Sequence, residues 1–345
     1  MIDKSLKLKK MKIISKTLRL LPIFILALGL VSCDSDDNND GPTAQSTTIV
    51  DLAASDPNLS VLVEALVRAD NAGANLVTTL SGPGPFTVLA PTNEAFANFL
   101  ATNNFNSLVE VPTELLTQVL LNHVIAGNIA SSNLFAAGSG YTNTNAVGPD
   151  SAFLSIYYYT DTTVTFNGVS DVITADVEAT NGTVHVVDAV IVLPTVVDFA
   201  LANPALSNLV AALQLADSQE PSPSLIPTLQ SDGPFTVFAP TNDAFADLLV
   251  ELDPSGNTEL GDLDPATVEA VLGVHVVADN VRSSELNTGA VPTLGGDINL
   301  DASTLILTDA NNRESQILAT AGLVDIQGIN GVVHVIGRVL LPAQN

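Results

Sequence analysis

The chain has 345 residues, of which 37 are acidic and 11 basic, and its formal net charge is −26. Seven of the basic residues precede residue 20, so the chain after residue 32 keeps four arginines, no lysine and 36 acidic residues, a formal net charge of −32. Such a surface repels phosphate backbones, which excludes nucleic acid as a partner. The only cysteine is Cys33, so a disulfide framework is excluded as well.

Residues 1–32 have the form of a signal peptide. Six lysines and Arg19 precede an apolar run that is too short to span a membrane as a helix. Met11 is an alternative start that leaves the same apolar run in place. The motif Leu30-Val-Ser-Cys33 resembles the lipobox of bacterial lipoproteins. This resemblance implies that Cys33 becomes the acylated N-terminus and anchors the protein to a membrane through its lipid.

Residues 33–47 are predicted to form an acidic tether, because they are too charged and too poor in apolar groups to pack. An acidic run directly after a lipidated cysteine resembles the surface-export signal of Bacteroidetes lipoproteins. The resemblance implies an outer-membrane lipoprotein whose folded part is exposed on the cell surface.

Part of the tether resembles a calcium loop. Four residues fit the first half of an EF-hand loop, namely Asp36, Asn38, Asp40 and Gly41. Position 12 of that loop would be Thr47 instead of a bidentate glutamate, and no helices flank it. We therefore expect no cofactor and no dedicated metal site. Ca²⁺ stays open only as an ion that bridges surface carboxylates to an acidic glycan or a neighbouring cell.

Each half of the folded part opens with a predicted helix. Asp56-Pro57 and Asn203-Pro204 each place a capping side chain before a proline at the first helical position, and Gly73 ends the first helix. Apolar residues follow at helical spacing: Leu59, Leu62, Val63, Leu66 and Val67 in the first half, and Leu206, Leu209, Val210 and Leu213 in the second. One face of each helix is expected to pack on a core.

The longest repeated block spans residues 84–100 and returns at 233–249 with 13 of 17 positions identical. In each copy a Gly-Pro turn leads into a short apolar strand, and a proline ends the strand. Thr92 or Thr241 then caps a helix that begins at once. The block thus predicts a strand joined directly to a helix.

Another helix follows in each copy, and the chain then turns to β structure. The apolar residues of these helices are Leu115, Leu116, Val119 and Leu120 in the first copy and Val268, Val271 and Leu272 in the second. Strands are predicted at 154–159, 164–166 and 172–177, and again at 305–308 and 318–326. A helical first half and a β-rich second half predict an α+β fold.

A second block, residues 181–190, returns as 330–339 at the same offset of 149 positions. Its Asn-Gly pair predicts a tight hairpin turn before a β-branched strand. Together the two blocks resemble the fasciclin-like domain family. The resemblance implies two tandem fasciclin-like domains, over residues 48–194 and 195–343, each a helical first half packed on a β-rich wedge.

The four histidines occupy matching places in the two copies. His185 and His334 lie in the middle of Val-His-Val strands, which is typical of structural histidines satisfied by hydrogen bonds. His123 lies on the apolar stripe at the end of its helix, and His275 matches it. For this second pair, core packing and contact with a partner are both open.

The family resemblance adds a hypothesis about the second pair. In animal fasciclin-like domains a Tyr-His pair has been tied to binding of cell-surface receptors. His123 and His275 match its histidine, whereas Asn122 and Val274 stand in place of its tyrosine. These four residues are binding candidates, although integrin-type recognition is not expected without the tyrosine. The resemblance also assigns a structural role to the residues of the Ala-Pro-Thr-Asn blocks: Thr92, Asn93, Thr241 and Asn242.

One strand differs between the copies. In the run from Phe153 to Tyr159, period-2 alternation places Tyr157 and Tyr159 on one face and Tyr158 on the other. The corresponding strand of the second copy has no aromatic residue. Tyr157 and Tyr159 are therefore candidates for contact with sugar or protein, with ordinary core and surface packing as the alternative.

No catalytic motif emerges from the chain, so we expect a protein that is not an enzyme. The sequence predicts a lipid-anchored cell-envelope adhesion protein that binds cells, matrix or glycans non-covalently. Self-association is an open alternative mode of binding. The alternative is a structural spacer or partner-binding subunit of the envelope. An enzyme acting on extracellular polymer is a remote alternative.

Overall fold

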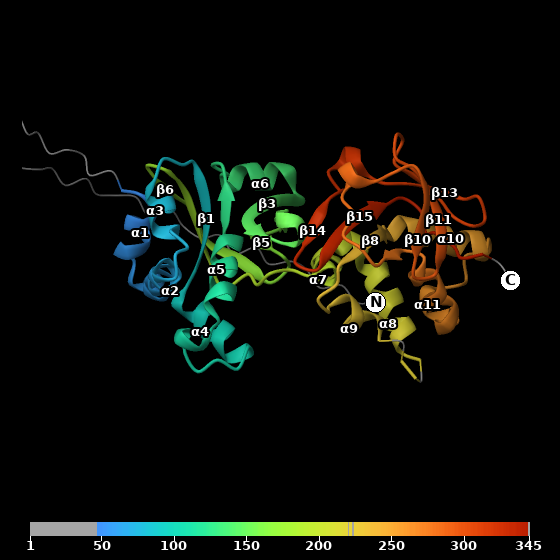
Figure 1. Ribbon diagram of the computed structural model, residues 1–345, viewed down its shortest axis with the longest axis horizontal. Helices are drawn as coiled ribbons and strands as arrows, with labels where there is room; N and C mark the ends of the chain where they lie inside the picture. Colours follow the sequence, from blue (N-terminus) through green and yellow to red (C-terminus); the bar gives the residue numbers. More distant parts are fainter. Residues whose placement is uncertain (1–46, 220, 223, 344–345) are drawn as a thin grey trace, which may run out of the picture. The chain divides into compact units, whose positions relative to one another are not determined.

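The computed structural model describes residues 47–343 except 220 and 223 (Figure 1). The signal peptide, Cys33 and the acidic tether up to residue 46 lie outside the described residues. Contacts group the described residues into one compact unit. Within it the α+β prediction is confirmed, because each repeat begins with helices and continues into strands.

The helices follow the predicted order in both repeats. Those of the first repeat are α1 (Ile49–Ser55), α2 (Ser60–Asn71), α3 (Leu76–Ser81), α4 (Asn93–Thr102), α5 (Thr113–Asn122) and α6 (Ser131–Ala137). Those of the second are α7 (Val196–Ala202), α8 (Ser207–Asp217), α9 (Leu225–Leu229), α10 (Asn242–Leu252) and α11 (Pro265–Gly273). The predicted helices are α2, α4 and α5 with their counterparts α8, α10 and α11. The short helices α1, α3, α6 and α9 were not predicted, and α6 interrupts the β-rich half.

The strands form three sheets. The first repeat holds β1 (Phe86–Pro91), β2 (Val124–Ala126), β3 (Ser139–Val147), β4 (Phe153–Thr160), β5 (Val164–Phe166), β6 (Ser170–Ala179) and β7 (Gly182–Val187) in the order β2-β1-β7-β6-β5-β4-β3. The second repeat splits its strands between two sheets. One sheet has the order β14-β15-β8-β9, with β14 (Ile326–Gly328), β15 (Gly331–Ile336), β8 (Phe235–Pro240) and β9 (Val276–Val277). The other has the order β10-β11-β12-β13, with β10 (Gly289–Thr293), β11 (Gly296–Asp301), β12 (Ile306–Thr308) and β13 (Glu314–Gln316).

The two repeated sequence blocks meet in space as a parallel strand pair. β1 pairs with β7 from Phe86 opposite Gly182 to Pro91 opposite Val187, and β8 pairs with β15 in the same register. In the second repeat, Figure 1 shows the two strands of this pair, β8 and β15, side by side. The pair joins the start and the end of each repeat.

Alternation along the central pair creates two cores in each repeat. In β1, Val88 and Ala90 face the helices, whereas Leu89 faces the other strands. In the second repeat Val237 lies among the helices and Phe238 among the strands. Because successive side chains point to opposite faces, one apolar strand serves both layers. A continuous apolar run is what a strand buried on both faces requires.

The predicted caps are present at the helix that follows each central strand. Thr92 Oγ1 accepts a hydrogen bond from the Ala95 amide at 3.1 Å, and Thr241 Oγ1 accepts one from the Ala244 amide at 3.2 Å. Asn93 accepts a hydrogen bond from the Val61 amide and donates one to the Pro57 carbonyl.

Asn242 makes the equivalent bonds in the second repeat, to the Asn208 amide and the Pro204 carbonyl. The threonines thus cap their own helices, and the asparagines tie the start of that helix to the start of α2 or α8.

The substitution Thr241→Ala is expected to lower the unfolding free energy by about 1 kcal/mol, because the first turn of α10 loses its side-chain acceptor. Thr241→Ser keeps the hydroxyl and is the matched control. Urea unfolding of both variants checks the prediction. Equal stability of the alanine and serine variants would contradict it.

The repeats contact each other through strands β3 and β4 of the first repeat and through α7 and β14 of the second. Tyr141 in β3 packs against Phe199 in α7, with ring centroids 5.9 Å apart, and its hydroxyl accepts a hydrogen bond from Asn203 at 3.1 Å. Ser155 in β4 accepts a hydrogen bond from the backbone amide of Gln327 in β14. The second repeat's α7 face is therefore covered by the first repeat.

Within the described residues no single helix has both the length and the apolar character needed to cross a membrane. The segments Val196–Ala202 and Pro204–Asp217 meet these criteria only as a pair, and they are bent by 106° relative to each other.

Candidate functional site

His123 and His275 lie in the cores of their repeats. Nδ1 of His123 donates to the Val119 carbonyl at 2.7 Å, and Nε2 accepts from the Ile191 amide at 3.0 Å. His275 bonds equivalently to the Val271 carbonyl and the Leu340 amide. Both are neutral rings with both nitrogens satisfied, and burial lowers the pKa of each to about 4. Each ring joins a helix end to the last segment of its repeat.

The neighbouring candidates are buried as well. Asn122 is fully buried and donates to the carbonyls of Ile191 and Val192, while its side-chain oxygen accepts from Thr144. Val274 is 2% exposed. Side chains this deeply buried offer no surface to a docking partner. The hypothesis that these four positions contact a partner directly is therefore corrected: in this fold they are core residues.

His185 and His334 hold the opposite ring orientation. Nε2 of His185 donates to the Ile129 carbonyl, and Nδ1 accepts from the Asp176 amide. His334 bonds in the same way to the Val281 carbonyl and the Asp325 amide. Burial lowers the pKa of His334. The bonds to Ile129 and Val281 join the segment after β2 or β9 to the central strand, β7 or β15, that carries the histidine.

The tyrosine strand is only partly available. Tyr157 is 3% exposed and packs against Tyr141, with ring centroids 5.0 Å apart. Burial raises its pKa. The core-packing alternative therefore holds for Tyr157, and its candidacy as a contact residue is corrected, because the partner strand β3 covers this ring with Tyr141. Tyr159 shares its face, as alternation predicts, and is half-buried. Tyr159 is the one member of this pair with surface to offer.

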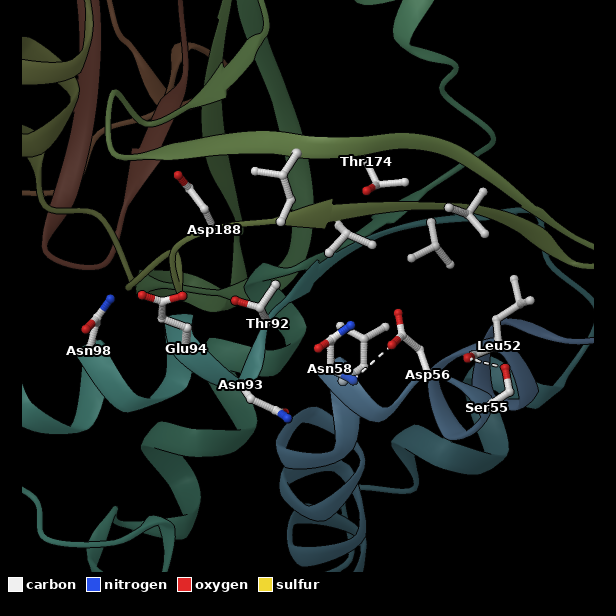
Figure 2. A pocket seen from close by; sticks show the side chains of 15 residues that line it. Leu52, Ser55, Asp56, Asn58, Thr92, Asn93, Glu94, Asn98, Thr174 and Asp188 are labelled. Carbon is white, nitrogen blue, oxygen red and sulfur yellow. Dashed lines mark hydrogen bonds between the residues drawn. The ribbon is translucent and has the colours of Figure 1, made fainter.

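A groove on the first repeat is the more developed site (Figure 2). It has a volume of about 800 Å³ and runs between the helical side and strands β6 and β7. Ligand sites in proteins usually fall between about 300 and 1,000 Å³. The polar groups in its lining are Ser55, Asp56, Asn58, Thr92, Asn93, Glu94, Asn98, Thr174 and Asp188. An aliphatic floor completes it: Leu52, Leu59, Ile173, Val177, Val184 and Val186.

The groove contains both fixed and available polar groups. Asp56 accepts from the Asn58 amide, and Thr92 and Asn93 make the capping bonds described above. Glu94 and Asn98 are exposed and rise from the first turns of α4 toward the strands (Figure 2). Amide, hydroxyl and carboxylate groups above an aliphatic floor suit a ligand rich in hydroxyl groups.

The second repeat does not reproduce this lining. Its equivalents of Asp56, Asn58 and Asp188 are Asn203, Ala205 and Gly337. Asn203 is moreover bonded to Tyr141 of the first repeat. Among the described residues, the polar groove is thus a property of the first repeat.

Carboxylates in the groove set limits on its ligand. Among the described residues no three His, Cys, Asp or Glu side chains are grouped so that they could hold a metal ion. The groove has three acidic side chains and no basic one. Like charges repel, so an acidic polymer would need a bridging cation, whereas a neutral one would not.

Comparison with known proteins explains the repeat. The fasciclin domain profile matches residues 57–194 and 204–342, which is most of the chain. The chain belongs to the fasciclin family.

Relatives in this family come from bacteria and animals. Protein sll1483 of Synechocystis is 37% identical over 150 residues, which are 43% of this chain and 73% of that protein. Human periostin is 31% identical over 272 residues, covering 76% of this chain and 29% of periostin. Immunogenic protein MPT70 of Mycobacterium tuberculosis is 33% identical over 148 residues, 41% of this chain and 67% of that protein. The chain thus spans less than a third of periostin.

A solved FAS1 domain pair from the insect cell adhesion molecule Fasciclin I is also similar. It has a TM-score of 0.49 and 20% identity, and the match covers 81% of this chain and 96% of that one.

Proposed function

We propose that this fasciclin-family chain is a lipid-anchored adhesion protein of the bacterial cell envelope, which binds cells, matrix or envelope glycans without covalent chemistry. Three features support the proposal: the family itself, the lipobox around Cys33, and the polar groove of the first repeat. The insect relative with a solved domain pair is named as a cell adhesion molecule. The acidic tether supports a place on the outer face of the outer membrane.

The groove is the observation that carries the proposal. Its exposed Glu94 and Asn98 stand above an aliphatic floor, in a hollow large enough for several sugar rings. Its negative charge favours a neutral polysaccharide, or an acidic one bridged by Ca²⁺. No step of bond making or breaking is involved.

The test uses a soluble chain of residues 34–345 with immobilised neutral and acidic polysaccharides and with intact bacterial cells, in calcium and in chelator. We expect saturable binding that weakens by about tenfold in the double variant Glu94→Gln and Asn98→Ala, since two polar contacts are lost. Loss of binding in chelator would assign the ion-bridged mode.

The matched control changes the equivalent positions of the second repeat, Asp243→Asn and Asp247→Ala. These changes remove acidic charge from a repeat that lacks the polar lining. Because the control removes two negative charges and the groove variant removes one, equal or greater weakening by the control would show that general charge, and not the groove, governs binding. Absence of any binding would favour a spacer or partner-binding subunit instead.

A further inference from the structure

The second repeat has an apolar groove. At the equivalent place in the first repeat, side chains of that repeat fill the space and close the groove. The groove has a volume of about 580 Å³ and lies between α10, α11 and residues 341–343. The side chains that the argument uses from its lining are Leu249, Leu252, Leu260, Leu263 and Val271. Leu252 is 55% exposed, so the apolar lining of the groove reaches solvent at this residue.

Equivalent positions of the two repeats differ in burial. The short 3₁₀ helices Leu108–Glu110 and Leu260–Asp262 correspond, and so do α5 and α11. In the first repeat, this region buries three apolar residues almost completely: Leu108, Val111 and Val119. Their counterparts are only partly buried: Leu260, Leu263 and Val271. The same framework therefore leaves apolar surface open in the second repeat.

Two side chains account for the difference. In the first repeat Phe105 packs beside Phe99, with ring centroids 6.5 Å apart, and covers this region. Arg68 reaches over from α2 and donates to the Val109 and Val111 carbonyls at 2.8 and 2.7 Å. An aromatic ring and a guanidinium thus close the groove together.

The second repeat has neither side chain. Its residue at the position of Phe105 is Asn257, which is exposed, and its residue at the position of Arg68 is Leu215. The matching carbonyls in the second repeat are those of Gly261 and Leu263. No arginine stands at the position of Arg68 to donate hydrogen bonds to them. The framework keeps the place for an aromatic ring and a cation without supplying either.

The charge around the groove favours a cationic ligand. Asp253, Glu259, Asp262 and Asp264 all fall between α10 and α11, and no basic residue occurs in that segment. A second copy of this chain would bring a formal charge of −32 to the contact, which opposes self-docking. A cationic ligand is attracted instead.

We infer that this apolar groove binds a partner polypeptide segment that presents an aromatic side chain next to an arginine, in place of the missing Phe105 and Arg68 pair. The aromatic ring fills the apolar hollow, and the guanidinium donates to the carbonyls of Gly261 and Leu263 beside the acidic loop. This inference is independent of the polar groove on the first repeat. It assigns a protein partner to the second repeat.

The test measures fluorescence anisotropy of a labelled decapeptide of alternating phenylalanine and arginine with the soluble chain of residues 34–345. Leu252→Lys is compared with Val250→Lys, because both residues are exposed on α10 and only Leu252 lines the groove. The two variants add the same charge. We expect Leu252→Lys to weaken binding about tenfold and Val250→Lys to leave it within about twofold.

A second variant introduces into the second repeat the arginine and the phenylalanine that the first repeat has at these positions. Leu215→Arg with Asn257→Phe should close the groove and abolish peptide binding while the first repeat is unchanged. Peptides with serine for phenylalanine, or glutamine for arginine, should each bind about tenfold more weakly.

Three results would overturn the inference. Equal binding to the Leu252→Lys and Val250→Lys variants would mean general attraction to an acidic surface. Binding of neutral phospholipid vesicles with no peptide binding would assign the groove to lipid. A concentration-dependent dimer that Leu252→Lys dissociates, again without peptide binding, would assign it to a second copy.

Discussion

Lowering the pH from 7.5 to 4 is expected to remove about 3 kcal/mol of unfolding free energy from each repeat through one buried histidine. Burial holds the pKa of His123 and of His275 at about 4, against 6.5 for an exposed ring. One pKa unit corresponds to about 1.4 kcal/mol. Below pH 6.5 the unfolded chain binds a proton that the folded chain does not, so stability falls with pH until the folded pKa is reached.

The variants His123→Gln and His275→Gln remove the titrating ring while a glutamine amide can donate and accept like the two ring nitrogens. We expect each to be less stable than the parent at pH 7.5 and to lose less stability on acidification. Urea unfolding at pH 7.5, 6, 5 and 4 gives the slopes. His334 acts in the same direction in the second repeat, since burial also lowers its pKa. Parallel slopes for parent and variants would refute the assignment.

The local elements of the fold could be predicted from the sequence because their signals are local. A threonine after a proline, followed by Asn and an acidic residue, is enough to place the start of α4 and α10 at the observed residues. The Asn-Gly blocks likewise predict the turns before β7 and β15, which the structure has. The family resemblance added the expectation of two tandem fasciclin-like domains, and the family match confirms it.

Pairing between distant segments could not be predicted in the same way. β1 pairs with β7 across almost the whole first repeat, and no local pattern identifies that partner. Tyr157 shows the consequence: alternation placed it correctly on the face of Tyr159, but its burial depends on Tyr141 in a neighbouring strand and on the next repeat. Val67 was expected on the core side of its helix and is 48% exposed.

The apolar groove of the second repeat could be predicted only in part from the sequence. The exchange of Phe105 for Asn257 and of Arg68 for Leu215 is visible once the repeats are aligned through their 3₁₀ helices. Its meaning is not visible, because only the structure shows that Arg68 reaches two carbonyls far along the chain. Repeat proteins offer this comparison without a second protein: one copy shows what the other lacks.

Asn330→Ala is expected to lower the unfolding free energy of the second repeat by about 4 kcal/mol. The side chain of Asn330 is 2% exposed and makes three hydrogen bonds to backbone. It accepts from the Val196 amide at 3.0 Å and donates to the carbonyls of Leu229 and Ser231 at 2.8 and 2.7 Å. It therefore joins the start of α7 and the end of α9 to the central strand pair.

Removing this side chain leaves three backbone groups without their partner, and each buried unsatisfied group costs about 1–3 kcal/mol. Asn181 makes the same three bonds in the first repeat, to the Ile49 amide and the Leu80 and Gly82 carbonyls, but it is only partly buried. Water can replace part of what Asn181→Ala removes, so its effect should be smaller by about 1–2 kcal/mol.

Urea unfolding with a probe in each repeat, for example a tryptophan introduced at Phe96 or Phe245, separates the two losses. Asn330→Asp is the isosteric control: it keeps an acceptor for the Val196 amide and loses both donated bonds, so it should also be destabilising. If Asn330→Ala and Asn181→Ala lower the unfolding free energy by the same amount, burial does not determine how much these asparagine hydrogen bonds contribute to stability. If neither is destabilising, the Asn-Gly block serves the turn alone, and the link between helices and sheet rests on apolar packing.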